Sequence, residues 1–269
     1  MKRVLVINDI CCFGKASITE MLPVLSAMGI ECSLLPTALL SAHTGGLGQV
    51  HRVDLSEDMM KIAGHYKELQ LHFDAIYVGY LAGNAQIDTV SQIIDILREE
   101  DTLVFMDPSM ADNGRLYSGF EEDYPEKLKV LLKKAGCLLP NVTELCLLCD
   151  EDPKTEIDWQ KLNTLLYRLS DECNGADVIL SGVENHGRLQ VSVLQDDICT
   201  EYIHKKIEGH FHGCGDLFAA VVIGNVLKGK QLDEAVEKAA LFVLECIEKT
   251  VEEGTDERYG LSFEEVIRN

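Results

Sequence analysis

The chain has 269 residues, of which 45 are Asp or Glu and 24 are Lys or Arg, and its formal net charge at pH 7 is -21. This balance argues against nucleic acid and anionic membranes as partners, because both select a basic patch that displaces counterions. No apolar run approaches the roughly 20 residues needed to span a bilayer, and the N-terminal apolar run is too short for a signal peptide. We therefore expect a cytoplasmic protein that binds neither nucleic acid nor a membrane.

Short apolar strands alternate with helices along the chain. The expected strands are 3–9, 31–36, 73–81, 102–108, 137–141 and 176–182. The expected helices are 17–29, 56–71, 87–100, 122–136, 143–149, 158–173, 215–229 and 231–251. This alternation predicts βαβ units, and therefore an α/β fold in which helices cover both faces of a mainly parallel sheet.

Three further segments complete the predicted fold. Residues 187–194 and 197–206 alternate like an antiparallel strand pair at one edge of the sheet. The glycine-rich segment 43–56 predicts a loop or flap. Because no low-complexity linker divides the chain, residues 1–269 are expected to form a single domain.

The ten cysteines do not predict a disulfide framework, because the chain has no secretory features. Cys146 and Cys149 form one C-x-x-C pair, with no second pair nearby to complete a zinc site. Spacing along a buried helix explains them better. Cys11 and Cys12 follow the first strand, and we expect all ten thiols to be reduced and free of metal.

Polar or small residues follow several of the apolar strands directly. In open parallel sheets, ligands bind beyond the carboxyl ends of the strands. This rule selects the following pocket candidates: Asn8–Asp9, Gly79–Tyr80, Asp107–Pro108, Asn141 and Ser181–Gly182.

The stretch Gly213-Cys214-Gly215-Asp216 stands directly before an apolar helix. It is not a dinucleotide fingerprint, which should follow the first strand and which requires glycine where this chain has Phe218. No Walker A loop occurs either. Two interpretations remain for the stretch, a plain tight turn or an anion pocket.

Physical chemistry favours the anion pocket. The backbone N–H groups of 213–216 would be free donors at the positive end of a helix dipole, and glycines let an anion approach closely. Asp216 would repel that anion unless it had a task there. Accepting a proton from a substrate hydroxyl is such a task. Phosphoryl transfer depends mostly on positioning, so a weak carboxylate base suffices.

Four motifs in order resemble the pyridoxal kinase branch of the ribokinase-like superfamily, as does the G-x-G-D stretch. They are "SAHTGG" (41–46), "VGYLAG" (78–83), "VFMDPSMADNGRLY" (104–117) and "LLPNVTEL" (138–145). The resemblance covers residues from about 8 to 220. It implies a three-layer α/β/α sandwich and an ATP-dependent kinase that phosphorylates the hydroxymethyl group of pyridoxal, pyridoxamine or pyridoxine.

The same resemblance assigns roles to individual residues. Asp216 would be the general base, and Gly213, Cys214 and Gly215 the anion hole. The substrate would contact Asp9, Thr44 and Tyr80, and ATP would contact Asp107, Asn141, Glu144 and Ser181. Mg²⁺ would be served by Asp107, Asp112 and Glu144, the last through water. Helix capping is an alternative role for Asn141 and Glu144. A homodimer is also implied, while a K⁺ requirement stays open.

Three positions depart from the family pattern. Cys214 replaces the usual Thr or Val, and a thiol at a helix N-terminus should have a lowered pKa; we therefore expect oxidation or alkylation there to inactivate the enzyme. Asp9 replaces a Ser and would favour a protonated pyridine ring, or it would cap the helix from Ser17. The segment 11–17 keeps only Gly14 of the usual motif.

Other functions compete with this hypothesis. A hydroxymethylpyrimidine kinase of thiamine synthesis shares the anion hole, but usually has cysteine in place of Asp216 and lacks the "HTGG" match. Sugar and nucleoside kinases usually carry an N-terminal insertion that is missing here. A non-catalytic nucleotide-binding protein is disfavoured, because such a scaffold need not keep Asp216, Asp107 and Glu144 together.

Overall fold

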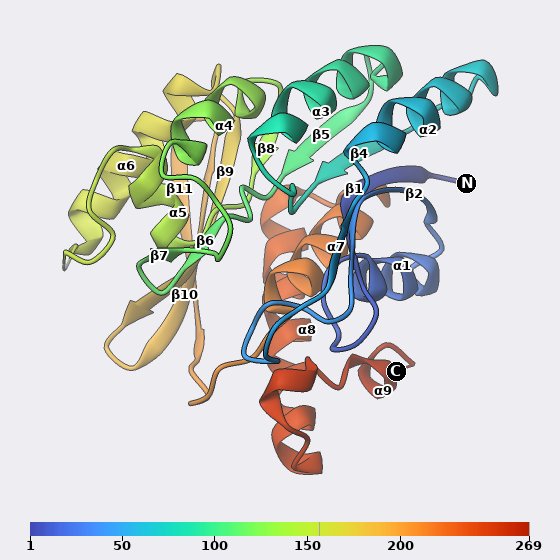
Figure 1. Ribbon diagram of the computed structural model, residues 1–269. Helices are drawn as coiled ribbons and strands as arrows, with labels where there is room; N and C mark the ends of the chain where they lie inside the picture. The colour runs from blue at the N-terminus through green and yellow to red at the C-terminus, as the bar shows by residue number, and fades with distance from the viewer. Residues whose placement is uncertain (156, 269) are drawn as a thin grey trace.

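The computed structural model describes residues 1–155 and 157–268; Glu156 and Asn269, the last residue of the predicted domain, lie outside the described residues. Its main feature is a nine-stranded sheet (Figure 1). The strands follow one another across the sheet in the order β11 (Ile198–Lys205), β10 (Arg188–Gln195), β9 (Asp177–Asn185), β8 (Cys137–Leu138), β5 (Leu103–Met106), β4 (Ala75–Val78), β1 (Arg3–Cys11), β2 (Glu31–Leu40) and β3 (Arg52–Asp54).

The six central strands from β9 to β2 are parallel to one another. At one edge β10 pairs antiparallel with both β9 and β11, and at the other edge β3 pairs antiparallel with β2. The predicted mainly parallel sheet with an antiparallel edge is therefore confirmed. The second antiparallel edge, at β3, was not predicted.

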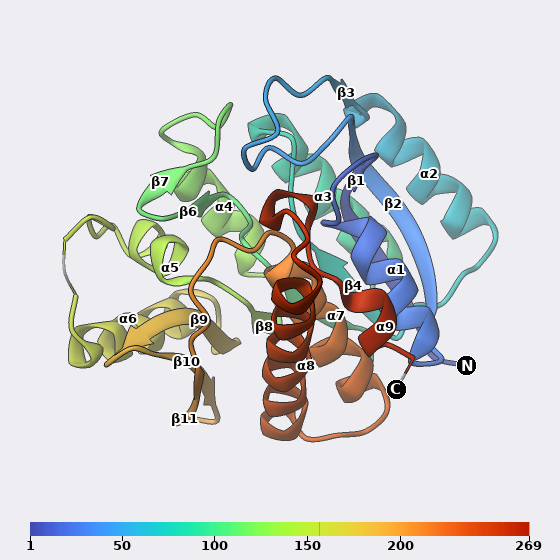
Figure 2. The same ribbon diagram turned by 90° about the horizontal axis from the view of Figure 1, so that it is seen from below.

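Helices cover both faces of the sheet (Figures 1 and 2). One face packs against α2 (Ser56–Glu68), α3 (Asn84–Leu97), α4 (Tyr124–Leu132), α5 (Val142–Leu148) and α6 (Trp159–Glu172). The other face packs against α1 (Ile18–Ala27), α7 (Cys214–Leu227), α8 (Leu232–Glu253) and α9 (Phe263–Val266). These layers form the predicted three-layer α/β/α sandwich. No helix in the described part of the chain is both long enough and apolar enough to cross a membrane.

The central strand β1 shows why these runs are apolar throughout. Val4 and Val6 face the core under α1 and α7, whereas Leu5 and Ile7 face the core on the opposite side. A strand covered on both faces has no solvent side on which polar residues could alternate. The helix α7 is likewise buried from Leu217 to Gly224, because it lies between the sheet and its neighbouring helices α1 and α8.

The boundaries differ from the predictions where pairing is decided by distant segments. Strand β1 continues to Cys11, two residues beyond its predicted end at Asp9. The expected flap contains β3, whose three residues are all exposed and carry no periodic signal. The loop after β5 contains a small hairpin of β6 (Ala111–Asp112) and β7 (Arg115–Leu116). Helix α3 begins at Asn84, three residues before its predicted start at Ile87.

Candidate active site

The N-terminus of α7 opens at the carboxyl edge of the parallel sheet. Gly213 precedes the first helical residue with φ 87°, in the left-handed region that favours glycine. No side chain in the described ranges caps this helix. The first backbone N–H groups of α7 are therefore available to an anion, as the glycines suggest.

Asp216 is held in the first turn of α7 by two segments from the beginning of the chain. Asn8 Nδ2 donates to Asp216 Oδ1 at 2.9 Å, and the Ser17 N–H donates to Oδ2 at 2.8 Å. Burial raises the pKa of Asp216 to about 6, the two hydrogen bonds oppose this rise, and the nearby Asp9 adds to it. The carboxylate is thus oriented and mostly ionised at neutral pH. Its pKa lies near the working pH, as a general base requires.

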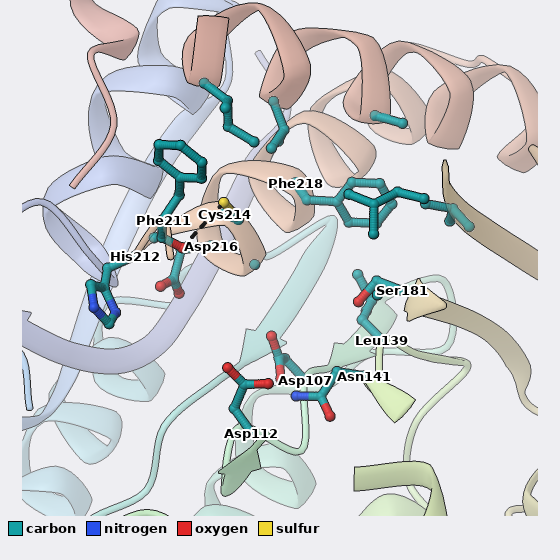
Figure 3. Close-up of a pocket in the computed structure, with 18 of the residues that line it drawn as sticks. Asp107, Asp112, Leu139, Asn141, Ser181, Phe211, His212, Cys214, Asp216 and Phe218 are labelled. Atoms are coloured by element: carbon teal, nitrogen blue, oxygen red, sulfur yellow. Dashed lines mark hydrogen bonds between the residues drawn. The ribbon is translucent and has the colours of Figure 1, made fainter. Parts of the chain in front are cut away.

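The carboxylates of Asp107 and Asp112 face Asp216 across the same space (Figure 3). Asp107 follows β5, and its Oδ1 accepts the Ser109 N–H at 2.9 Å. Burial raises the pKa of Asp107 well above its ordinary value, and the charges of Glu144 and Asp216 raise it further. A bound cation would relieve this crowding of negative charge.

Asn141 and Glu144 form a capping box at the start of α5. The Glu144 N–H donates to Asn141 Oδ1, and the Asn141 N–H donates to Glu144 Oε2, both at 3.0 Å. Glu144 Oε1 also accepts the N–H groups of Met110 and Ala111. Burial raises the pKa of Glu144 to about 7, while these hydrogen bonds lower it. The capping role is therefore present, and it ties α5 to the loop after β5.

A cavity of about 370 Å³ connects these groups. It is lined by nine of the predicted site residues, namely Asp107, Asp112, Asn141, Glu144, Ser181, Gly213, Cys214, Gly215 and Asp216. It is also lined by apolar residues that include Leu189, Val191, Ile207, Phe218, Val243 and Ile247. A cavity lined by both charged and apolar side chains suits a ligand that joins phosphates to an aromatic base.

The predicted substrate residues Asp9, Thr44 and Tyr80 do not line this cavity. Asp9 is buried, and its carboxylate accepts a hydrogen bond from the Cys11 thiol at 3.2 Å. The Asp9 carboxylate is also hydrogen-bonded to the Ser17 side chain at the start of α1, whereas the Ser17 N–H donates to Asp216. Thr44 is exposed in the flap. The Tyr80 N–H donates to Asn8 Oδ1, so Tyr80 lies on the β1 side of Asp216.

The flap after β2 is fastened beside the start of α7. The His43 and His212 rings lie 4.6 Å apart between centroids. A methyl group on Gly45 would come within 2.7 Å of His212 Nε2, so a side chain at this position would displace the His212 ring. On its other side, His43 Nε2 lies 2.7 Å from the carbonyl oxygen of Arg258. The flap, the loop before α7 and the C-terminal segment therefore meet at one edge of the site.

The expected low pKa of Cys214 is wrong. Burial raises the pKa of this thiol to about 12, and the nearby Glu20 raises it further. The side chain turns away from the helix axis, and its Sγ donates to the Phe211 carbonyl oxygen at 3.4 Å (Figure 3). Desolvation and a neighbouring acid outweigh the helix dipole, so the thiol is expected to be inert at neutral pH.

We therefore expect alkylation at neutral pH to spare Cys214. Iodoacetamide should modify the exposed Cys12 first, and peptide mapping by mass spectrometry should find Cys214 unmodified while activity is retained. The Cys12→Ser variant is the control, because it removes the most exposed thiol and leaves Cys214 in place. Rapid labelling of Cys214 in that variant would contradict this prediction.

The donor set is compatible with Mg²⁺ that keeps most of its own waters. Among the described residues, only His72, Glu99 and Asp101 bring three potential ligand atoms close together, and they lie outside the cavity. Asp107, Asp112 and Glu144 thus form no closed cage. Mg²⁺ commonly binds through one or two carboxylates plus waters and phosphates. These residues can provide the carboxylates.

Several residues of the site were missed from sequence. Asn8 was selected only as a strand-end residue, and its bond to Asp216 was not foreseen. His204 lines the cavity, and its Nε2 is buried without a partner among the described residues. Glu20 lies behind Gly213. No local pattern reveals the bond from Asn8 to Asp216 or the places of His204 and Glu20, because these depend on segments far away in the chain.

The sheet order, the three layers and the N-terminus of α7 beside the carboxylates of Asp107 and Asp112 are those of a kinase of the ribokinase-like class. Residues 12–259 match the family model described as phosphomethylpyrimidine kinase. The chain belongs to the phosphomethylpyrimidine kinase family.

Known relatives resemble the chain over nearly its whole length. A pyridoxine/pyridoxal/pyridoxamine kinase of Bordetella pertussis is 27% identical, with 91% of this chain and 88% of the relative covered. The structure of pyridoxal kinase from Lactobacillus plantarum has a TM-score of 0.92 at 29% identity, covering 100% of this chain and 96% of that one. A Bacteroides thetaiotaomicron protein, provisionally described as a phosphomethylpyrimidine kinase and crystallised with pyridoxal, has a TM-score of 0.94 at 34% identity, covering 100% and 95%.

Proposed function

We propose that this protein transfers the γ-phosphoryl group of ATP to the 5′-hydroxymethyl group of pyridoxal, pyridoxamine or pyridoxine. The observation that carries the proposal is the start of α7, where an oriented carboxylate stands beside an uncapped helix N-terminus. The relative crystallised with pyridoxal and the relatives named as pyridoxal kinases support the choice of substrate.

The chemical step needs few groups. The hydroxymethyl oxygen attacks the γ-phosphorus and forms a new P–O bond, while the bond from the γ-phosphorus to the bridging oxygen breaks and ADP leaves. Asp216 accepts the hydroxyl proton. The backbone N–H groups of Gly213, Cys214 and Gly215 stabilise the negative charge on the group in transfer.

The nucleotide would occupy the cavity with its base against the apolar residues and its phosphates at the start of α7. Asp107, Asn141, Glu144 and Ser181 would lie near the phosphates. Mg²⁺ would be held by Asp107 and Asp112, and by Glu144 through water, and when bound it would neutralise charge on the triphosphate. Glu144 has little capacity for a direct bond to the metal, because it already accepts three backbone N–H groups.

The vitamer would bind on the β1 side of Asp216, opposite the nucleotide. Asn8 links the two sides, since it donates to Asp216 and accepts the N–H groups of Asp9 and Tyr80. Asp9 and Tyr80 are kept as proposed substrate residues on this argument, and Thr44, exposed in the flap, is kept on the family resemblance alone. The two substrates would then meet at the Asp216 carboxylate.

Substrate identity is tested by measuring ATP consumption with Mg²⁺ for pyridoxal, pyridoxamine, pyridoxine and hydroxymethylpyrimidine side by side. Turnover of at least one vitamer, with hydroxymethylpyrimidine the poorer substrate, is expected. The family description favours hydroxymethylpyrimidine as the second candidate, and preferential turnover of that compound would replace the vitamin B6 assignment. ATP binding without turnover of any of the four would refute both.

Removing the side chain that caps α5 is expected to lower both stability and ATP affinity, whereas removing the cap of α6 should lower stability alone. Asn141→Ala and Asp158→Ala each delete a side chain that caps a helix, α5 or α6, and each should lower the free energy of unfolding by about 1 kcal/mol. Only Asn141→Ala should also weaken ATP binding measured by calorimetry, because only Asn141 lines the cavity. Equal ATP affinity in the two variants would contradict a nucleotide role for Asn141.

We further propose that residues 1–269 act as one kinase domain and assemble as a homodimer, as the family resemblance implies. Light scattering after size-exclusion chromatography measures the mass directly, and a monomer of 29.9 kDa at working concentration would refute the dimer.

A further inference from the structure

Glu20 of α1 is a buried acid that the proposed phosphoryl transfer does not use. It is 0% exposed, and neither of its carboxyl oxygens has a hydrogen-bond partner among the described residues. An ionised carboxylate without partners is strongly disfavoured in an apolar environment, whereas the neutral acid is tolerated. Glu20 therefore either keeps its proton or requires a compensating cation.

Glu20 lies directly behind the turn that begins α7. A methyl group added to Gly213 would come within 2.5 Å of Glu20 Oε1, so the carboxyl group contacts the backbone at this position. The same turn carries the N–H groups of Cys214 and Gly215. The charge on Glu20 is thus placed where it acts on the site that would receive the phosphoryl group.

The groups around Glu20 supply little positive charge. Those that interact with it belong to the segment before α1 and to α7, α8 and α9; they are Lys15, Cys214, Asp216, Cys246 and Glu264. Lys15 is the one cation in this set, and it is already paired with Glu264 at 3.0 Å. Burial raises the pKa of Glu20 well above its ordinary value, Asp216 raises it further, and Lys15 opposes the rise.

We propose that Glu20 is a positioning residue that supports the anion-binding turn as a neutral carboxylic acid, and that loss of its proton weakens this turn. The neutral acid fills the space behind Gly213 without adding charge. The ionised form opposes an arriving phosphoryl group by like-charge repulsion. This inference rests on the proposed function of the turn as the receiver of that group.

The proton can be tested without catalysis. The folded protein holds the Glu20 proton more tightly than the unfolded chain, so the free energy of unfolding should fall as pH rises from the ordinary glutamate pKa toward the raised one. The urea midpoint of Glu20→Gln minus that of wild type should therefore be larger at pH 8.5 than at pH 5.5. Glu245→Gln, at an exposed position of α8, should follow wild type at both pH values. If the difference in urea midpoint between Glu20→Gln and wild type is the same at both pH values, the proposal is overturned.

The effect on function is tested by the pH profile of kcat for the vitamer that is turned over. At pH 6.5, Glu20→Gln should stay within about threefold of wild type. Above the raised pKa, the ratio of wild type to Glu20→Gln should fall by up to about tenfold per pH unit. A ratio that does not change with pH overturns the proposal.

Other outcomes are also decisive. If wild type turns over no vitamer, the proposed function fails; the ATP affinity by calorimetry then replaces kcat in the same comparison, and the unfolding experiment still applies. If Glu20→Gln does not fold, Glu20→Met provides a side chain of similar length without an ionisable group. Glu20 could instead be an ionised ligand of a cation. In that case KCl, but not choline chloride, would stabilise wild type, and KCl would not stabilise Glu20→Gln. This result would show that the neutral-acid proposal is wrong.

Discussion

Asp216→Asn is expected to lower kcat by about 10²-fold or more, because the amide cannot accept the hydroxyl proton in the transition state. The side chain keeps its shape, and an amide oxygen can still accept a hydrogen bond from Asn8 or Ser17. The KM for ATP should therefore change much less than kcat. Steady-state kinetics with the preferred vitamer, with circular dichroism as a check on folding, measures both quantities.

The matched control is Asp233→Asn, since Asp233 occupies the first turn of α8 as Asp216 occupies that of α7. Both changes remove a negative charge from a helix N-terminus, but Asp233 is outside the cavity. Its variant should keep wild-type kcat. Equal losses in the two variants would show that the helix charge matters and that Asp216 is not the base.

The same assignment predicts an acid limb in the wild-type pH profile. The base must be ionised to accept a proton, and the pKa of Asp216 is raised to about 6. Activity should therefore fall as pH decreases through about 6, by up to about tenfold per pH unit. A profile that stays flat down to pH 5 would contradict a base with this pKa.

Gly213→Ala is the second large effect that we expect. A residue with a side chain in the left-handed region carries a strain of about 1–3 kcal/mol, and here its methyl group would also collide with Glu20. Either the buried Glu20 side chain or the turn must shift to relieve this contact, and a shift of the turn by a few tenths of an ångström displaces the N–H groups of the proposed anion hole. We expect reduced stability together with a kcat loss of about 10²-fold.

Gly229→Ala provides the comparison for this variant. Gly229 has φ 84°, close to the 87° of Gly213, but a methyl group there meets nothing within 4 Å. It should show the backbone strain alone and keep wild-type kcat. The double variant Glu20→Ala/Gly213→Ala should recover part of the lost stability. Equal unfolding free energies for the two glycine variants would mean that Glu20 does not press against the turn.

The architecture was accessible from sequence because its signals are local. Apolar runs of strand length, helical periodicity and a glycine before an apolar helix are each determined by neighbouring residues. The strand-end rule also selected Asn8, Asp107, Asn141 and Ser181 correctly as residues of one sheet edge. Strand β3 was not predicted because its residues Arg52–Asp54 are exposed and pair with β2 only through the folded flap.

Cys214 shows where local reasoning failed. Its position at a helix N-terminus predicts a lowered pKa, but burial by elements that lie far away in the sequence raises the pKa, and Glu20 raises it further. The rule about the helix dipole is sound, and desolvation outweighs it here. A residue's titration cannot be read from its own segment when distant packing removes it from water.

The sequence by itself determined the alternating α/β architecture, the polar strand ends and the glycine pair with Asp216 at the start of an apolar helix, since periodicity and turn chemistry are properties of short segments. Only the tertiary structure decided that Asn8 and Ser17 orient Asp216, and that Glu20 lies unpartnered behind Gly213. The physical reason is that burial and the choice of hydrogen-bond partner depend on which distant segments the folded core brings together.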